Sequence, residues 1–181
     1  VLFPLRSNDE TIGYIMSINF DRERSEYIKT LLGVTSFILA SEISNHQLFN
    51  RMKFLSDTDL LTGIYNRNAM NNRVADIVNG ITPIRDSFGV IFVDLNGLKV
   101  VNDNEGHAAG DRLLKRASCV LKDMFPCAEI YRVGGDEFLI LLTSENEEAF
   151  NRAVKDLKDR VEQPGEVSMA VGACFGLGDM D

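Results

Sequence analysis

The chain has 181 residues, of which 19 are Lys or Arg and 27 are Asp or Glu, so its formal net charge is −8. Hydrophobic residues make up 45% and charged residues 25% of the chain, which excludes a disordered or fibrous protein and allows a core without disulfides. The acidic balance, with a pI near 4.8, argues against a nucleic-acid partner or a broad membrane-binding surface, while a local basic pocket for a small anion remains allowed.

The three cysteines, Cys119, Cys127 and Cys174, form no CxxC pair and no zinc-binding spacing. We therefore expect reduced, buried thiols in a cytoplasmic protein. No run approaches the ~18 consecutive apolar residues of a membrane span, so we expect no membrane contact from this segment. Because the chain begins at Val1, we expect a piece of a longer protein whose upstream part could carry a membrane anchor.

The first third of the chain predicts two short strands and a long helix. Residues 1–20 read as two strands around a polar turn at 7–10. From 21 to 55, apolar residues recur at helical spacing, with a candidate break at Gly33.

The second half of this helix, 41–56, is polar with a thin apolar stripe that includes Phe49 and Met52. Such a stripe is typical of a coiled-coil seam, but a helix folded back on its own domain can show it too. The sequence leaves both interpretations open.

The next elements alternate between helix and strand. Asn66 is placed to cap a helix that ends at Gly80. The nearly continuous apolar run FGVIFVDLN at 88–96 predicts a central strand that is buried on both faces. A helix is expected to follow at about 108–124.

Two apolar runs, 130–133 and 138–142, surround a Gly-Gly turn and predict a β-hairpin. Ser144 and Glu147 predict a capping box before another helix, and 167–175 predicts a last strand. This order of elements predicts an α/β sandwich, in which helices pack on one sheet with mixed strand directions.

Polar residues gather where the central strand is expected to end. Asp94 closes that strand, and several polar residues follow it: Asn96, Lys99, Asn102, Asp103, His107 and Asp111. α/β folds place ligand-binding groups at such strand ends. Each residue taken alone is more often an ordinary turn or loop residue, so the inference depends on the whole cluster.

The hairpin tip adds Asp136 and Glu137, two adjacent carboxylates that fold stability does not require. If the two strands are neighbours, Asp94 and Asp136 approach each other. Carboxylates with a backbone carbonyl suit Mg²⁺, which proteins usually hold together with substrate phosphates. The glycines at 134–135 would let a phosphate approach the backbone, and Lys99 would supply positive charge. A plain tight hairpin is the alternative for this tip.

Four segments then stand in a characteristic order: DTDLLTGIYNR (57–67), DLNGLKVVNDNEGHAAGD (94–111), YRVGGDEF (131–138) and VSMAVGA (167–173). They resemble the opening motif, the metal- and guanine-binding segment, the signature and a late strand of the GGDEF family of diguanylate cyclases. The resemblance implies a fold related to the palm of nucleotidyl cyclases and polymerases. It also implies condensation of two GTP into cyclic di-GMP, with release of two pyrophosphates, in bacterial second-messenger signalling.

The resemblance implies roles position by position. Asp94, the Leu95 carbonyl and Asp136 match ligands of Mg²⁺ or Mn²⁺, and Asp136 also matches the residue assigned to activating the 3′-hydroxyl. Glu137 matches a further metal or acid–base position. Asn102 and Asp111 match readers of the guanine edge, and His107 matches a position associated with substrate. The complete expected substrate site is Lys99, Asn102, His107, Asp111, Gly134 and Gly135.

This sequence departs from the family pattern in three places. Asn96 and Gly97 replace an acid and a bulky residue, which resembles a known variant of the motif. The chain stops at Asp181, before a C-terminal helix that brings further basic residues to the phosphates, so we expect this segment to bind GTP poorly. Residues 125–128, FPCA, stand where the family's inhibitory RxxD product site would be, so we expect that site to be absent.

Residues 1–40 resemble, through the pattern GYIMSINF followed by a helix, the C-terminal fragment of a GAF sensory domain. We expect 41–56 to be a helical linker and 57–181 to be the catalytic domain. A fragment this short cannot close a GAF ligand pocket, so we expect no sensing by this segment.

Three functions stay open at this point. The first is a diguanylate cyclase, which must act as a homodimer because each 3′-hydroxyl attacks the GTP held by the other domain. The second is a degenerate module that binds GTP or cyclic di-GMP without catalysis. The third is a cyclase that makes a mixed dinucleotide. The intact Asp94, Asp136 and Glu137 favour an enzyme, and Asp111 favours GTP as the only substrate.

Overall fold

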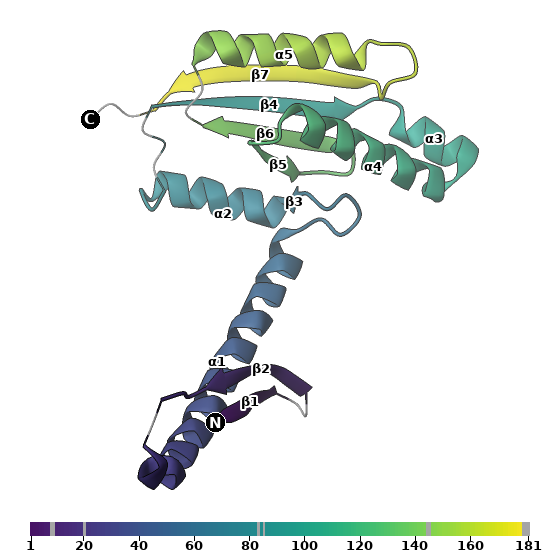
Figure 1. Cartoon of the computed structure of the whole chain (residues 1–181). Helices are drawn as coiled ribbons and strands as arrows, with labels where there is room; N and C mark the ends of the chain where they lie inside the picture. The colour runs from purple at the N-terminus through teal and green to yellow at the C-terminus, as the bar shows by residue number, and fades with distance from the viewer. Residues whose placement is uncertain (8–9, 20, 83, 85, 144–145, 179–181) are drawn as a thin grey trace. The chain divides into compact units, whose positions relative to one another are not determined.

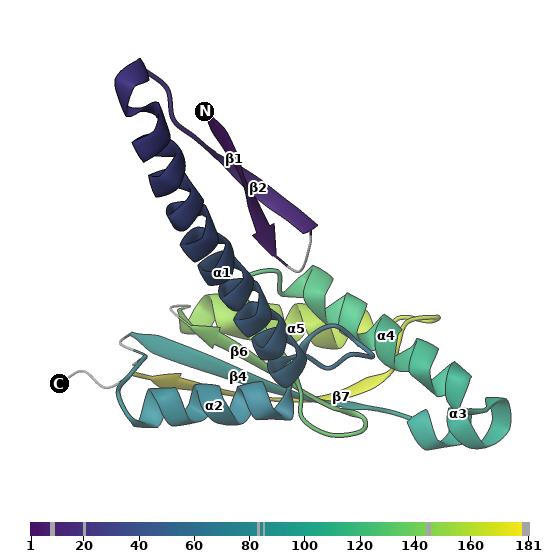
Figure 2. The same cartoon turned by 90° about the horizontal axis from the view of Figure 1, so that it is seen from below.

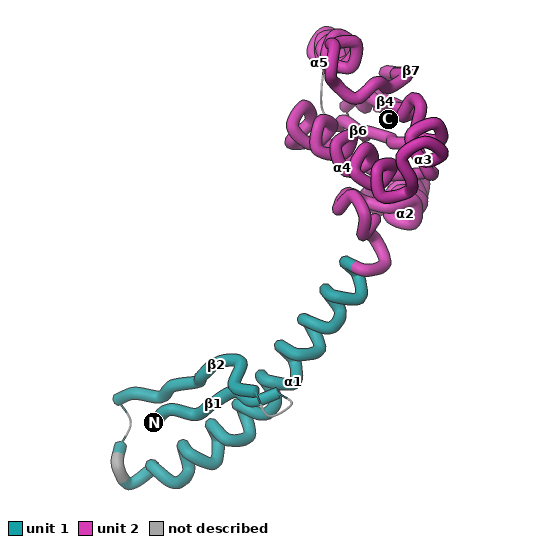
Figure 3. The backbone as a smooth tube through the Cα atoms, turned by 90° about the vertical axis from the view of Figure 1, so that its right-hand side faces the viewer, with its two compact units in different colours: residues 1–54 teal, residues 55–181 magenta. Residues whose placement is uncertain are grey.

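In the computed structural model, which describes residues 1–7, 10–19, 21–82, 84, 86–143 and 146–178, the chain divides into two units. They comprise residues 1–54 and 55–181 (Figure 3). No helix among the described residues is both long and apolar enough to cross a membrane. The expected boundaries at residues 40 and 56, and the GAF origin of the first segment, stay predictions.

The first unit is a β-hairpin packed on a helix. Strands β1 (Leu2–Ser7) and β2 (Glu10–Met16) pair antiparallel, as expected, and the middle of their turn lies outside the described residues. A short 3₁₀ turn (Arg22–Arg24) leads into helix α1 (Ser25–Asp57). The expected single long helix is confirmed, and α1 runs through Gly33 without the candidate break. One internal glycine costs only about 1 kcal/mol, which the rest of so long a helix can offset.

The second unit is built on a five-stranded sheet (Figure 1). Its strands are β3 (Tyr65–Asn66), β4 (Ser87–Leu95), β5 (Glu129–Arg132), β6 (Glu137–Thr143) and β7 (Met169–Leu177). The strand order is β3-β5-β6-β4-β7, in which only β3 and β5 run parallel. The predicted sandwich with mixed strand directions is therefore confirmed.

Helices cover the two faces of this sheet unequally. Its helices are α2 (Arg67–Val78), α3 (Leu98–Glu105), α4 (His107–Met124) and α5 (Glu147–Val161). Apolar residues of α4 and α5 share one core with β4 and β6, represented by Leu121, Leu157, Val93 and Ile140. Helix α2 lies on the other face, against β3 and β5 (Figure 2). The prediction of a helix from about residue 108 omitted α3, which is short, polar and bounded by Gly97 and Gly106 with positive φ.

Two helix caps can be compared with the predictions. Asn66 caps α2 as expected, since its Oδ1 accepts from the Ala69 N–H at 3.0 Å. The cap of α5 is Asn146, which accepts from the Ala149 N–H at 2.8 Å, so the expected capping box is wrong. Glu147 is the first residue of the helix, and Ser144 lies outside the described residues.

Two burial predictions are wrong. The odd-numbered side chains of β4, such as Ile91 and Val93, are fully buried, but Phe92 on the opposite face is 41% exposed. Cys174 pairs with Val90 on that same open face and is exposed, as are Cys119 and Cys127. All three cysteines are free, as expected, but none is buried. In the described part of the chain, only the α4–α5 face of β4 is closed.

Candidate functional site

The end of β4 and the tip of the β5–β6 hairpin meet through backbone pairing. Asp94 is the register partner of Glu137, and the Leu95 N–H donates to the Asp136 carbonyl at 2.9 Å. Residues directly opposite each other in an antiparallel pair project to the same face of the sheet. The two predicted halves of the site are therefore neighbours, and Asp94 and Glu137 share one face.

The strand end and the hairpin tip together carry three carboxylates, Asp94, Asp136 and Glu137, which we call the carboxylate cluster. The ion pairs among the described residues of this unit engage other carboxylates, namely Asp59, Glu129, Glu148 and Glu166. Asp94, Asp136 and Glu137 are not among them. Because adjacent like charges repel, this arrangement favours a cation supplied from outside the chain.

The two glycines of the turn differ in their surroundings. The Glu137 carboxylate folds over Gly134, where a Cβ would overlap its Oε2. Space at Gly134 therefore accommodates the side chain of Glu137. In the described structure, nothing lies within 4 Å of a Cβ built on Gly135. Of the two glycines expected to admit a phosphate, only Gly135 leaves its surroundings open.

The residues expected to bind metal are all oxygen donors. Asp94, Asp136 and the Leu95 carbonyl form a donor set that suits Mg²⁺ or Mn²⁺, whose remaining positions substrate phosphates and water usually fill. No group of three or more His, Cys, Asp and Glu side chains in the described chain is close enough to hold a metal alone. The site therefore fits a metal that binds together with a nucleotide, and the ligand assignments stay predictions.

The expected guanine readers lie on two consecutive helices. Asn102 is on α3 and Asp111 is on α4, and the Gly106 N–H donates to the Asn102 carbonyl at the junction. The Asn102 side chain lies against Gly110, where a Cβ would overlap its Oδ1. This contact brings Asn102 next to the helical turn that carries Asp111.

Lys99 and His107 are less tightly placed. Lys99 lies in the first turn of α3 and His107 begins α4, and both side chains are exposed. No hydrogen bond or ion pair in the described structure joins either of them to the three carboxylates. Their substrate roles stay predictions.

Sequence reasoning missed the residue that holds the hairpin turn. Arg132 donates from Nη2 to the Gly135 carbonyl at 2.7 Å, and from Nη1 to the two Asp59 oxygens at 3.2 and 3.3 Å. Both side chains are mostly buried. Asp59 lies in the 57–67 motif and Arg132 in the 131–138 motif. Their presence in these two motifs is the sequence signal that could have pointed to the pair.

Asp59 is held in its charged form. Burial by itself raises the pKa of Asp59, but hydrogen bonds from Thr62 and the charge of Arg132 outweigh it, so that the pKa lies below its usual value. The Thr62 N–H and hydroxyl donate to Asp59 Oδ1 at 2.9 and 2.6 Å. Near neutral pH, the Arg132 guanidinium is therefore paired with an ionised Asp59 carboxylate.

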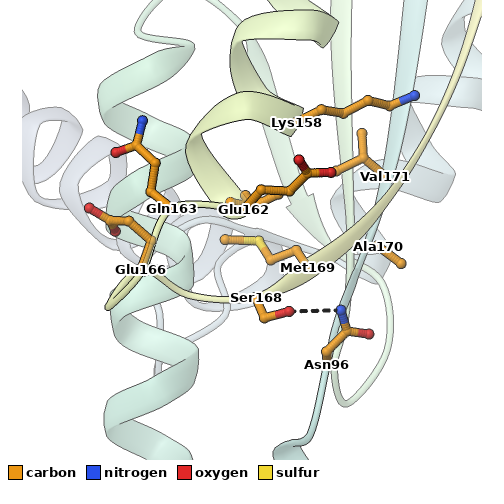
Figure 4. A pocket seen from close by; sticks show the side chains of 10 residues that line it. Asn96, Lys158, Glu162, Gln163, Glu166, Ser168, Met169, Ala170 and Val171 are labelled. Atoms are coloured by element: carbon orange, nitrogen blue, oxygen red, sulfur yellow. Dashed lines mark hydrogen bonds between the residues drawn. The ribbon is translucent and has the colours of Figure 1, made fainter.

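A separate pocket of about 630 Å³ lies between the end of α5 and β7 (Figure 4). Asn96 and Ser168 stand at its edge, joined by a hydrogen bond of 3.1 Å from Asn96 Nδ2 to Ser168 Oγ. Its lining offers one cation, Lys158, and two carboxylates, Glu162 and Glu166. This charge balance disfavours a nucleotide. Asn96 comes from the polar cluster expected after the central strand, but none of the residues expected to bind metal, to bind substrate or to act in catalysis lines the pocket.

The model of the family described as "Diguanylate cyclase, GGDEF domain" matches residues 56–177. The chain belongs to the GGDEF family. Residues 56–177 include both strand ends and the Asp59–Arg132 pair, so the carboxylate cluster lies in the GGDEF domain itself.

Relatives and solved structures agree with this assignment. An uncharacterised Streptomyces griseus protein is 36% identical over 78% of this chain and 58% of its own length. The cyclic di-GMP phosphodiesterase PdeR of Escherichia coli is 32% identical over 66% of this chain, but over only 18% of its own length. The coiled coil and GGDEF domain of DgcB from Caulobacter crescentus, solved with c-di-GMP, has a TM-score of 0.62 at 18% identity and covers 83% of this chain and 84% of its own. That last likeness shows the fold alone.

Proposed function

We propose that this GGDEF domain is a diguanylate cyclase, which converts two GTP into one cyclic di-GMP and two pyrophosphates. The observation that carries the proposal is the β4–β6 pairing, which sets Asp94 against Glu137 and Leu95 against Asp136. Carboxylates without a protein cation, at the end of a buried strand, suit a divalent cation that arrives with nucleotide phosphates.

The reaction consists of two equivalent displacements. In each, a ribose 3′-oxygen forms a bond to an α-phosphorus, and the bond from that phosphorus to pyrophosphate breaks. Asp136 accepts the proton of the 3′-hydroxyl, and Glu137 is the second acid–base candidate. The leaving pyrophosphate carries away the electron pair of the broken bond.

The metal and the phosphates would share the carboxylate cluster. Asp94, Asp136 and the Leu95 carbonyl would hold Mg²⁺ or Mn²⁺, which supplies positive charge against the phosphate oxygens when bound. The open surroundings of Gly135 leave room for a phosphate near the backbone, and Lys99 adds positive charge from α3. His107 completes the expected substrate contacts at the start of α4.

The base would be selected between α3 and α4. The Asp111 carboxylate can accept from guanine N1–H and N2–H₂, and the Asn102 amide can both donate and accept. Adenine offers an acceptor at N1, so a carboxylate there favours guanine. This preference supports GTP as the substrate rather than a mixture of GTP and ATP.

The symmetry of the product requires two domains. Each domain would hold one GTP, and each 3′-hydroxyl attacks the nucleotide in the other domain, so the active species would be a homodimer. A dimer also explains why one domain carries a single set of guanine readers, Asn102 and Asp111.

A degenerate module that binds GTP or cyclic di-GMP without catalysis is the second candidate. The similarity to PdeR favours it, because a protein named a phosphodiesterase carries a matching segment. The three carboxylates argue for the cyclase, since nucleotide binding alone does not need adjacent repelling charges.

The decisive experiment incubates the protein that contains this chain with GTP and Mg²⁺ and identifies the products by chromatography and mass spectrometry. We expect cyclic di-GMP and pyrophosphate, no product with EDTA, and no mixed dinucleotide when ATP competes. GTP binding without product would favour the degenerate module. If the protein neither bound GTP nor formed a product, both candidate functions would be overturned.

A further inference from the structure

Strand β7 forms one edge of the five-stranded sheet (Figure 1). Among the described residues it pairs only with β4, in an unbroken antiparallel register from Met169 to Leu177. Its nine residues, MAVGACFGL, include no charged side chain and no proline. Charges, prolines, bulges and short length are the features that normally keep an edge strand from pairing with another chain, and β7 has none of them. We call the side of β7 that faces away from β4 the β7 edge.

The ladder with β4 shows which backbone groups point to the β7 edge. The Asn96 N–H donates to the Ser168 carbonyl, and the Gly178 N–H donates to the Asp86 carbonyl, both at 3.0 Å. Because opposite residues of an antiparallel pair alternate between bonded and non-bonded pairs, the even-numbered residues of β7 bond to β4. The odd-numbered residues direct their N–H and C=O groups to the β7 edge: Met169, Val171, Ala173, Phe175 and Leu177.

The side chains of these odd-numbered residues lie on the sheet face that α4 and α5 cover, because they stand opposite the buried odd-numbered residues of β4. Leu177, at the end of the strand, is nevertheless 66% exposed. At the start of the strand, the pocket of about 630 Å³ is lined in part by the apolar side chains of Val161, Met169 and Val171 (Figure 4). Strand β7 thus has an exposed apolar side chain at one end and an open pocket at the other.

We propose that β7 pairs antiparallel with β7 of a second copy of this chain, about a two-fold axis at Ala173. In this register Leu177 of each copy stands opposite Met169 of the other, so it projects toward the pocket of the other copy. Odd-numbered residues oppose odd-numbered residues, so the N–H and C=O groups at both β7 edges bond to each other. A second copy is the occupant that fits, because one two-fold axis joins both Leu177 side chains to both pockets.

Helix α5 leaves room for this pairing. Its Phe150 packs on Phe175 of β7, with ring centroids 5.5 Å apart, and also fills the space where a Cβ of Gly89 in β4 would lie. Helix α5 therefore lies over both strands and does not extend past the β7 edge. With neighbouring strands about 4.8 Å apart, the two α5 helices would be about 10 Å apart, which is the spacing of packed helices.

The charges of α5 are complementary in the same arrangement. The helix has Glu147 and Glu148 in its first turn and Lys158 and Arg160 in its last turn. The two-fold axis makes the two α5 helices antiparallel, so that the acidic turn of each lies on the side of the basic turn of the other. Opposite charges therefore come together, and β7 itself has no charge that its own copy would repel.

This pairing differs from the homodimer that the proposed function requires. Asp94 stands opposite Ala170, three residues from the axis, on the face that α4 and α5 leave open. With about 3.3 Å per residue and about 4.8 Å between strands, the two Asp94 residues would lie about 25 Å apart on one face of a continuous sheet. Two sites on the same face cannot exchange 3′-hydroxyls, so the β7 pairing is a separate interface and does not rest on the proposed function.

The first test is disulfide cross-linking in a chain with Cys119, Cys127 and Cys174 replaced by Ser. Ala173→Cys should form a covalent dimer under mild oxidation, because the two Cα atoms on the axis would be about 5.5 Å apart. Ala170→Cys is the matched control, since it changes another exposed alanine of β7 whose two copies would be about 20 Å apart. Linking by both variants would indicate parallel pairing or random collision, and linking by neither would indicate no pairing, so either result would overturn the proposal.

The second test changes the side chain that projects toward the pocket. In the Ala173→Cys chain, Leu177→Asp should lower the yield of cross-linked dimer by at least roughly tenfold, because the new carboxylate meets a lining that already contains Glu162 and Glu166. Val78→Asp adds the same charge at another strongly exposed apolar residue and should leave the yield unchanged. Thermal unfolding of both variants checks that they are folded. An undiminished yield with folded Leu177→Asp would contradict the assigned register.

Amide hydrogen exchange of the unaltered chain is an independent check that needs no variant. Raising the protein concentration should slow exchange at Val171, Ala173 and Phe175, while Gly172 and Cys174, already bonded to β4, should not change. Equal slowing in both sets, or none, would exclude the β7 pairing. Because no nucleotide is present in these tests, their failure would leave the proposed cyclase untouched, and pairing without cyclic di-GMP formation would remove only the cyclase.

Discussion

Arg132 binds both carboxylate oxygens of Asp59, with Nη1–Oδ distances of 3.2 and 3.3 Å. The same guanidinium holds the carbonyl of Gly135, which directly precedes Asp136. Nearby, Asn66 Nδ2 donates to the Ser56 carbonyl in the last turn of α1 at 2.7 Å. The segment that connects α1 to α2 is thus bonded both to the end of α1 and to the turn that carries the predicted catalytic carboxylate.

Asp59→Asn should loosen this turn. The variant loses the charge opposite a mostly buried guanidinium, so we expect the free energy of unfolding to fall by about 1–3 kcal/mol in urea denaturation at neutral pH. Cyclase activity should fall as well, because the Gly135 carbonyl loses its fixed donor. Glu148→Gln, which removes an exposed carboxylate, is the matched control and should change stability by less than about 0.5 kcal/mol.

The difference in unfolding free energy between wild type and Asp59→Asn should depend on pH. The folded-state pKa of Asp59 lies below its usual value, so its stabilising effect is fully present above that usual value, near pH 4. It is lost as the pH falls through the folded pKa, when the carboxylate is protonated. The stability difference between wild type and Asp59→Asn should therefore shrink below about pH 4, and a constant difference would contradict the assignment.

Asp136→Asn should abolish cyclisation without unfolding the domain. The Leu95–Asp136 bond uses the backbone carbonyl, which the variant keeps, while the carboxylate needed for the proton and the metal is lost. We expect the rate of product formation to fall by at least roughly 100-fold with an unchanged unfolding temperature. Asp156→Asn, an exposed carboxylate of α5, serves as the control, and turnover by Asp136→Asn near the wild-type rate would refute the role.

Asp111→Ala should weaken GTP binding by about 1–3 kcal/mol, because the guanine donors lose their acceptor. Metal binding should be spared, since Asp111 lies on α4 and the predicted ligands lie at the strand ends. Calorimetry with GTP and with GDP measures the effect. Undiminished affinity would show that Asp111 is only a charge near the start of a helix.

Gly110→Ala tests the position of Asn102. The added Cβ would overlap Asn102 Oδ1, so this side chain must move away from the turn that carries Asp111. We expect GTP affinity to fall by roughly tenfold, the cost of about one hydrogen bond. Gly172→Ala, at a position with no described atom within 4 Å of its Cβ, should bind GTP like the wild type. Equal affinities of the two variants would exclude Asn102 as a guanine reader.

Product feedback through the site upstream of the signature should be absent. Residues 125–128 connect α4 to β5 with the sequence FPCA, which offers neither the arginine nor the aspartate of RxxD. Initial rates measured with added cyclic di-GMP should show at most competition with GTP. Strong non-competitive inhibition would require a different allosteric site.

Local sequence signals determined much of this protein. The apolar runs at 88–96 and 138–142 predicted two strands, because continuous apolar segments of this length are typical of sheet interiors, and Asn66 predicted a helix start, because its amide can accept from the helix N–H groups. The four motifs identified the family, and the carboxylates marked the site. These features depend on residues close together in the chain.

Only the tertiary structure decided which distant residues meet. The pairing of Asp94 with Glu137, the Arg132 bridge to Asp59 and the contact of Asn102 with Gly110 each depend on packing between separate elements. Burial was decided in the same way. Phe92 and Cys174 are exposed in spite of their apolar character, because whether a sheet face is covered depends on where the helices lie, and no single strand encodes that.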